Sequence, residues 1–129
     1  MREICVLAFD FGLRHIGLAV GQSVTRTANR LTTLRANAGI PVWPALDDVV
    51  VEWQPDLMIV GLPLNMDDSE SAMSERARQF AERLRKRYDA RVELVDERLS
   101  SFEAKQIDRD DDHAMAAQLI AETWLNEMV

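Results

Sequence analysis

The sequence predicts a single α/β domain of three layers, in which a mixed five-stranded sheet is covered by helices on both faces. Three observations predict it. The chain has 129 residues, the size of one typical domain. Its first apolar segments follow one another across a glycine turn, as in an antiparallel hairpin. In the second half, apolar segments alternate with amphipathic ones, which requires parallel strands joined by right-handed crossovers.

The five expected strands are short apolar segments. Residues 4–9 and 16–21 form the hairpin around Gly12, and residues 31–34 can add a third strand to this meander. Residues 57–60 are apolar throughout, as in a strand covered on both faces, and residues 92–95 form the last strand. Because ligands gather beyond the carboxyl ends of parallel strands, the residues that follow these strands are the first candidates for a site.

The expected helices have apolar residues at helical spacing. Residues 42–53 carry Pro44 in the first turn and end before Pro55. Residues 69–88 follow a helical period and begin beside acids that can cap the helix. A short helix at residues 100–107 and a last helix at residues 114–128 complete a single domain that spans residues 1–129.

The charge pattern separates basic from acidic residues. The formal net charge is −7, which by itself argues against a nucleic-acid partner. Seven Arg and Lys residues nevertheless cluster within residues 76–91, and four Asp residues within residues 108–112. A basic flank beside an acidic pocket suits a metal-dependent nuclease, although a solvated helix face is the commoner meaning of such a basic run.

The single cysteine and the lack of long apolar runs predict a soluble, cytoplasmic protein. Cys5 lies in an apolar segment, where a buried structural thiol is expected rather than a nucleophile. No run approaches the roughly 18 apolar residues of a membrane span, and residues 1–9 are too short for the apolar part of a signal peptide. We therefore expect no membrane partner.

Two carboxylates that follow predicted strands are candidates for catalysis. Asp10 follows the first strand, where the backbone of Gly12 would let a phosphate or metal approach, and Glu97 follows the last strand. As structural alternatives, Asp10 can begin the hairpin turn, and Glu97 can be a strand-end charge in solvent. We expect the two strands to be adjacent, and like charges close together are costly unless a cation neutralises them. The sequence therefore predicts a metal site between Asp10 and Glu97.

Further ligands are expected at the start of the last helix. Acids at a helix N-terminus are favoured by capping and by the macrodipole, which explains one or two of those in residues 108–112. This argument does not explain His113. On helical spacing His113 shares a stripe with apolar residues, and Asp110 lies one turn earlier, whereas Asp112 falls on another stripe and is a rival ligand.

Carboxylate ligands predict a hard divalent cation, Mg²⁺ or Mn²⁺. In a two-metal site, one ion activates the attacking water and the other stabilises the leaving oxygen of a phosphodiester. Neutral His113 would act as a ligand, which favours Mn²⁺, or as a proton shuttle near neutral pH.

Four segments of the sequence resemble a known family. Residues 7–12 (LAFDFG), 15–21 (HIGLAVG), 59–66 (IVGLPLNM) and 96–100 (DERLS) together resemble the YqgF (RuvX) family of bacterial proteins. The resemblance spans nearly the whole chain and implies a ribonuclease H-like fold, related to that of the RuvC Holliday junction resolvases. It also implies a nuclease that matures the 5′ end of precursor 16S ribosomal RNA.

The resemblance assigns roles to individual residues. Asp10 and Glu97 take the first two catalytic acid positions. His113 takes the position where the family's last helix ordinarily opens with an Asp. Asp110, three residues earlier, matches an Asp of related resolvases that use His at this position.

Four further residues are candidates for substrate binding. Arg14, Arg76 and Arg98 lie in the matching motifs and are expected to contact phosphates. Asn65 follows the Gly-Leu-Pro turn and offers another polar contact. The alternatives are a solvated helix position for Arg76 and loop capping for Asn65.

We expect a metal-dependent nuclease that acts on structured RNA, with branched DNA as the alternative substrate. The chain is short between Ser100 and His113, where relatives usually carry a longer loop with basic residues. This difference supports a second hypothesis, a noncatalytic ribosome-associated binding module. The sequence leaves open whether the protein is a monomer or a weak homodimer.

Overall fold

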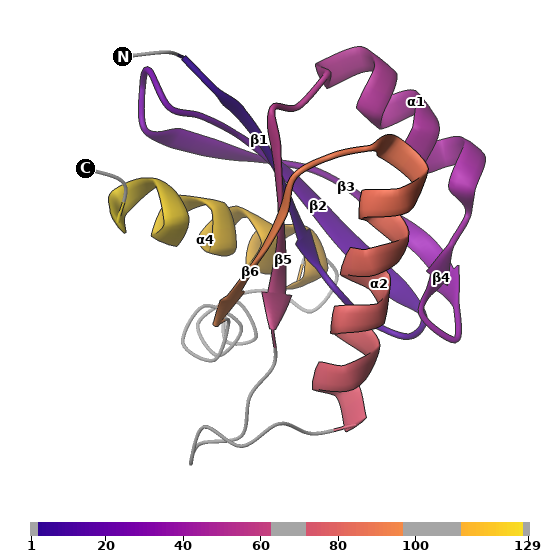
Figure 1. Cartoon of the computed structure of the whole chain (residues 1–129). Coiled ribbons are helices and arrows are strands. Elements are labelled where there is room, and N and C mark those ends of the chain that lie inside the picture. Colours follow the sequence, from indigo (N-terminus) through magenta and orange to yellow (C-terminus); the bar gives the residue numbers. More distant parts are fainter. Residues whose placement is uncertain (1–2, 63–71, 97–111, 128–129) are drawn as a thin grey trace.

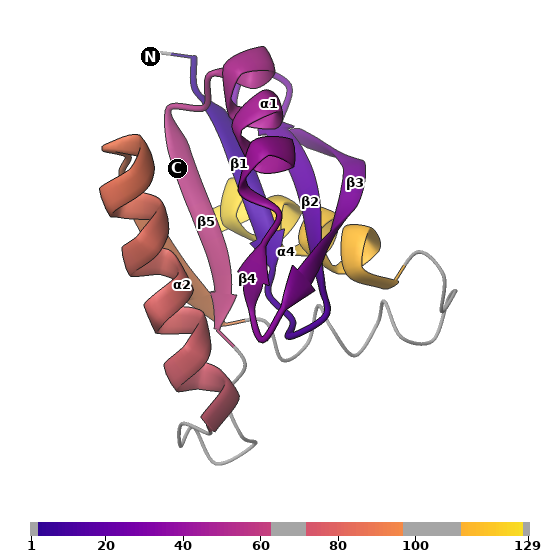
Figure 2. The ribbon, with the colours of Figure 1, turned by 90° about the vertical axis from the view of Figure 1, so that its right-hand side faces the viewer.

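The computed structural model describes residues 3–62, 72–96 and 112–127, except the side chain of Asp112. These residues form three layers (Figures 1 and 2). A mixed six-stranded sheet has the order β4-β3-β2-β1-β5-β6, with α1 and α2 on one face and α4 on the other. The predicted three-layer α/β fold is confirmed, and the helix expected at residues 100–107 lies outside the described residues. None of the described helices is long and apolar enough to cross a membrane.

The first three strands form the predicted meander. β1 (Cys5–Asp10) pairs antiparallel with β2 (His15–Gln22), which pairs antiparallel with β3 (Thr27–Asn37). β3 extends well beyond the predicted residues 31–34, because many of its positions are polar and exposed and an apolar run reveals only part of it.

A sixth strand makes the sheet one strand wider than predicted. β4 (Ile40–Pro41) pairs with the end of β3 across a tight turn, in which Ala38 and Gly39 have positive φ angles. The prediction of five strands is wrong because a strand of two residues is too short to show a periodic pattern. Pro41 lacks an N–H group and is tolerated because β4 is an edge strand.

The second half of the chain adds parallel strands. α1 (Trp43–Trp53) leads to β5 (Leu57–Leu62), and α2 (Ala72–Tyr88) leads to β6 (Val92–Asp96). β5 is parallel to both β1 and β6, as predicted, but it lies between them. The predicted adjacency of the first and last strands is therefore wrong. The crossover through α1 returns the chain to the free edge of β1, and β6 then pairs on the far side of β5.

Separate apolar cores fill the two faces of the sheet. On the face toward α1 and α2, the centre of the Phe80 ring lies 5.4 Å from that of Phe9 and 5.3 Å from that of Phe11. The face toward α4 (Asp112–Glu127) carries smaller side chains, several of them alanine. Small side chains allow α4 to approach the sheet closely.

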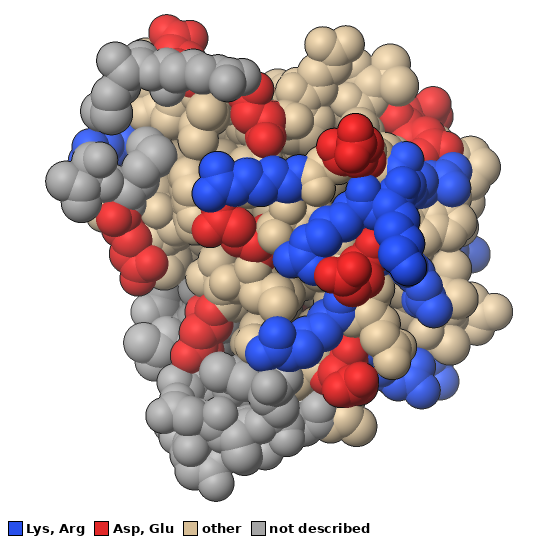
Figure 3. Space-filling model, in the orientation of Figure 1, with Lys and Arg blue, Asp and Glu red and all other residues tan. Residues whose placement is uncertain are grey.

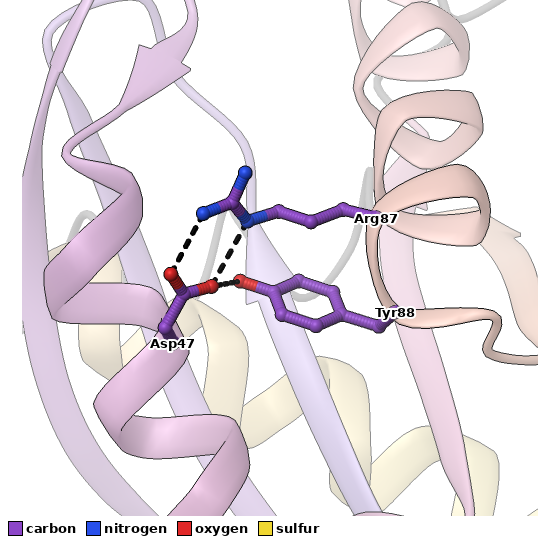
Figure 4. A network of polar contacts seen from close by, with 3 residues as sticks. All are labelled: Asp47, Arg87 and Tyr88. Atoms are coloured by element: carbon purple, nitrogen blue, oxygen red, sulfur yellow. Dashed lines mark hydrogen bonds and ion pairs between the residues drawn. The ribbon is translucent and has the colours of Figure 1, made fainter.

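Polar contacts tie α1 to the end of α2 (Figure 4). Arg87 donates two hydrogen bonds to the Asp47 carboxylate, at 2.9 and 2.7 Å, and the Tyr88 hydroxyl donates a third at 2.7 Å. These hydrogen bonds lower the pKa of Asp47 to about 2, and the bond from Arg87 has the largest effect. The Arg87 guanidinium also lies 4.7 Å from the centre of the Trp43 ring. These groups satisfy one another, so we assign the cluster a structural role.

The single cysteine is half-buried rather than fully buried as predicted, because Cys5 is the first residue of β1. Burial raises the pKa of its thiol, and the nearby charge of Asp56 raises it further. The thiol therefore stays protonated at neutral pH, as expected of an unreactive cysteine.

Candidate active site

Asp10 lies at the carboxyl end of β1 and faces α4. Side chains alternate along a strand, and Val6 and Ala8 of the same face belong to the core beneath α4. Only 9% of the Asp10 surface is exposed, and Asp10 is the one buried charged residue in the described part of the chain. A carboxylate with so little hydration requires polar or cationic partners.

His113, in the first turn of α4, supplies one such partner. Its Nδ1 atom lies 3.3 Å from Oδ2 of Asp10, although 103 residues separate the two along the chain. The imidazole is 39% exposed and the carboxylate 13%, so the pair is reachable from solvent. The sequence predicted that the first strand and the last helix converge on one site, and the structure brings Asp10 and His113 together.

Gly17 of β2 makes this contact possible. It lies opposite Asp10 in the β1–β2 register, and a Cβ atom at Gly17 would overlap with the backbone carbonyl of His113. The first turn of α4 therefore rests directly on the backbone of β2. Sequence reasoning did not single out Gly17, although a glycine inside a strand is a signal of close backbone approach.

The tight hairpin turn requires glycine at position 12. A Cβ atom at Gly12 would overlap with the backbone carbonyl of His15, and it would lie 3.9 Å from Cε1 of His113. Gly12 therefore borders the candidate site, and the approach of a phosphate or metal to its backbone stays a prediction.

His15 is a further residue of the site that sequence reasoning missed. Its ring stacks on that of His113, with 5.4 Å between ring centres and 27° between ring planes. His15 begins β2 and lies two residues before Gly17, so both face α4. Side chains alternate between the two faces of β2, and this alternation could have placed His15 on the same face as Gly17.

Several predicted site residues lie outside the described residues. These are Asn65, Glu97, Arg98 and Asp110. Asp112 is the first residue of α4, and its side chain is likewise not described.

The two remaining predicted residues lie on different parts of the surface. Arg14 is exposed in the turn between β1 and β2, next to His15. Arg76 is exposed on α2, where its Nη1 atom donates a hydrogen bond of 3.4 Å to the carbonyl oxygen of Ala38. α2 covers the face of the sheet opposite to that of His113, so Arg76 does not join the Asp10–His113 pair.

The basic segment of residues 76–91 is partly neutralised by neighbouring acids. Figure 3 shows acidic side chains interleaved with the Lys and Arg side chains on this face. Ion pairs of the segment include Arg85–Glu82, Arg87–Asp47 and Arg91–Glu93. These pairs favour the interpretation of this segment as a solvated helix face.

The fold places this chain among α/β proteins that share the architecture of Holliday junction resolvases. RuvC of T. thermophilus, in complex with a Holliday junction substrate, matches 93% of this chain and 92% of its own, with a TM-score of 0.61 and 15% identity. The fowlpox virus Holliday junction resolvase matches 98% of this chain and 100% of its own, with a TM-score of 0.60 and 8% identity. At such low identity these likenesses concern the fold.

Sequence comparison gives the family. A family model described as "RuvX: Holliday junction resolvase" matches residues 4–127, and the chain belongs to this family, as the sequence motifs predicted. A relative from Nitrosococcus oceani is 52% identical over 95% of this chain and 86% of its own length. A relative from Haemophilus ducreyi is 47% identical over 94% of this chain and 95% of its own. Both carry the name "Putative pre-16S rRNA nuclease".

Proposed function

We propose that this protein is a metal-dependent nuclease that hydrolyses phosphodiester bonds at the 5′ end of precursor 16S ribosomal RNA. Membership of the RuvX family and the names of the relatives confirm the predicted nuclease class. The observation that carries the proposed mechanism is the contact between Asp10 and His113 at one end of the sheet. Because ribosomal RNA is made in the cytoplasm, we propose the same location for the protein.

The Asp10–His113 pair fits a divalent cation. Neighbouring ligands of an octahedral ion bound at about 2.1 Å lie about 3 Å apart. The 3.3 Å between Asp10 Oδ2 and His113 Nδ1 is close to this value and long for a charge-assisted hydrogen bond. A carboxylate oxygen suits Mg²⁺ and Mn²⁺, and the imidazole nitrogen favours Mn²⁺.

We propose the remaining metal ligands from the acidic residues that follow β6 and from those at the start of α4. Within the described residues no three ligand-type side chains converge. Along β6 the residues that face α4 are Glu93 and Val95, and the next position of this series in the sequence is Glu97. Asp110 and Asp112 flank the start of α4 in the sequence. We propose Glu97 as the second carboxylate ligand, with Asp110 or Asp112 completing the set.

Gly61 supports a site that bridges β1 and β6. It belongs to β5, which lies between those strands, and it pairs with Val95 of β6. Val60, the residue before it, pairs with Phe9 of β1, so Gly61 follows at the level of Asp10. Glycine at this position places no side chain of β5 between the ends of β1 and β6.

Each residue of the pair has a defined task in the proposed reaction. Asp10 would hold the cation through Oδ2, and because Asp10 is largely buried on β1, its carboxylate has few other orientations. His113 would bind through Nδ1, which leaves its Nε2–H group to donate a hydrogen bond to water or to the leaving oxygen. The bound cation would supply an activated water and neutralise charge on the phosphate.

A cleavage assay tests the proposal. Purified protein is incubated with precursor 16S RNA and Mn²⁺, beside the variants Asp10→Asn and His113→Ala. We expect each variant to lower kcat by at least about 100-fold, because each removes a metal ligand. The matched control is Asp48→Asn, an exposed acid on α1, which should cut like the wild type. Equal cutting by the wild type and Asp10→Asn would refute the mechanism.

The description of the family model favours branched DNA as a second candidate substrate. A four-way DNA junction is therefore assayed in parallel at the same enzyme and metal concentrations. Faster cutting of the junction than of precursor RNA would make the protein a resolvase. Calorimetric titration with Mn²⁺ tests the hypothesis of a noncatalytic binding module. Binding of Mn²⁺ at micromolar to submillimolar concentration would rule out this hypothesis. No binding at millimolar Mn²⁺ would favour it.

A further inference from the structure

The side chains around His113 extend the candidate site toward β3. The His15 ring stacks on His113, and His15 lies directly opposite Arg35 in the β2–β3 register. Residues directly opposite each other in an antiparallel pair point to the same face, about 5 Å apart. Arg35 therefore shares the α4 face with His15 and Asp10.

The Arg35 side chain is exposed to solvent. Within residues 3–62, 72–96 and 112–127, it forms no ion pair with an acidic side chain. By contrast, Arg85 and Arg87 of α2 are paired with carboxylates. His15 is also exposed, and its ring nitrogens can donate to an anion.

We propose that His15 and Arg35 form a phosphate-binding pair that grips the nucleic-acid backbone beside the cleaved bond. This inference rests on the proposed nuclease function. It adds the path of the nucleic-acid backbone across the protein surface. Its backbone crosses the ends of β1, β2 and β3 in that order, with the cleaved phosphate at Asp10 and a neighbouring phosphate at Arg35. A guanidinium matches phosphate through two parallel N–H donors, which suits it to this task.

A phosphate contact at Arg35 predicts how substitution of Arg35 changes KM, kcat and affinity. Contacts to phosphates set affinity without reading sequence, and each one contributes to the salt dependence of binding. Loss of Arg35 should therefore raise KM and leave kcat nearly unchanged. RNA and DNA of the same sequence should lose affinity by similar factors.

The test measures binding in EDTA, so that it does not depend on cleavage. The probe is a fluorescent RNA hairpin with a single-stranded 5′ extension, titrated with full-length protein from about 50 to 200 mM salt. Arg35→Ala should weaken binding about 5- to 10-fold and reduce the slope of log K against log salt by about one. Arg35→Lys keeps the charge and should recover part of the affinity.

The matched control is Arg83→Ala, which removes one exposed charge from α2 on the opposite face of the sheet. It should bind like the wild type. Equal affinities for Arg35→Ala and Arg83→Ala would overturn the proposal, even if the Asp10 variant abolishes cleavage. A selective loss with Arg35→Ala would support it even if the cleavage mechanism fails.

A second variant separates the two possible roles of His15. His15→Phe keeps an aromatic ring against His113 but removes the N–H donor. Weaker binding by His15→Phe supports a phosphate contact. Wild-type binding by this variant would remove His15 from the phosphate-binding pair.

Discussion

Gly17 of β2 lies in contact with the backbone of His113, at the strand position directly opposite Asp10. The side chains of Asp10 and His113 therefore meet because a third residue has no side chain. The position of α4 and the geometry of the site are set by the same contact.

Gly17→Ala should disrupt the site. The added methyl group would push the first turn of α4 away from β2 and separate His113 from Asp10. We expect a loss of about 1–3 kcal/mol in the free energy of unfolding, as for other overpacked sites, together with weaker Mn²⁺ binding. Urea denaturation and calorimetry measure the two effects.

Gly21→Ala is the matched control for this prediction. A Cβ atom at Gly21 would lie 3.0 Å from Cδ1 of Leu125, the end of a side chain that can adjust. Gly21→Ala should therefore destabilise the protein less than Gly17→Ala and leave Mn²⁺ affinity unchanged. Similar metal affinities for the two variants would contradict the role given to Gly17.

His113→Asp should change the metal preference. An oxygen ligand in place of the imidazole nitrogen favours the harder ion, and the resemblance to the family places an Asp at this position. We expect the ratio of cleavage rates in Mg²⁺ and Mn²⁺ to rise at least about fivefold, whereas His113→Ala should lose activity with both ions. An unchanged ratio in His113→Asp would argue against His113 as a ligand.

Asp47→Asn should lower stability in a pH-dependent way. Hydrogen bonds from Arg87 and Tyr88 lower the pKa of Asp47 from 3.8 to about 2, so the folded state prefers the charged carboxylate. The stabilisation is fully present above the ordinary pKa and is lost as the pH falls toward about 2. Tm of wild type and variant should therefore differ at pH 7 and converge in acid.

Asp48→Asn serves as the control, because Asp48 is an exposed neighbour on the same helix. It should leave Tm nearly unchanged at both pH values. A constant Tm difference between wild type and Asp47→Asn down to pH 2 would show that charge is not the source of the stabilisation.

Phe80→Ala should remove the centre of the core between the sheet and α2. Phe80 is fully buried and contacts the rings of Phe9 and Phe11. We expect a loss of about 3–5 kcal/mol in the free energy of unfolding. Val51→Ala, at a position 71% exposed on α1, should change it by at most about 0.5 kcal/mol. A loss below about 1 kcal/mol for Phe80→Ala would contradict the described packing.

Much of the fold could be predicted because most elements have periodic apolar patterns. β1, β5 and α2 follow such patterns closely, and their types and connections match the prediction. β4 could not be predicted because two residues carry no period, and most of β3 was missed because its exposed positions are polar. The order of β1, β5 and β6 depends on which sheet edge is free, which local patterns do not contain.

Part of the candidate site could be predicted from charged residues at the ends of the expected strands and helices. Asp10 and His113 were named from their places after a strand and at the start of a helix, and they meet in the structure. His15 was missed because its place in the site depends on stacking with the ring of His113, which lies 98 residues later in the chain. Gly17 was missed because its role depends on docking of α4, a tertiary contact. The functional roles of Glu97, Asp110 and the other candidates outside the described residues stay predictions.

The contact between Asp10 and His113 also bears on when the enzyme becomes competent during its own synthesis. With 103 residues between them, and a ribosome adding about 5–20 residues per second, roughly 5 to 20 seconds pass between the incorporation of the first and the second. Throughout that interval the nascent polypeptide contains Asp10 but not yet His113. Under the proposed mechanism, the chain gains cleavage activity only after α4 has been synthesised.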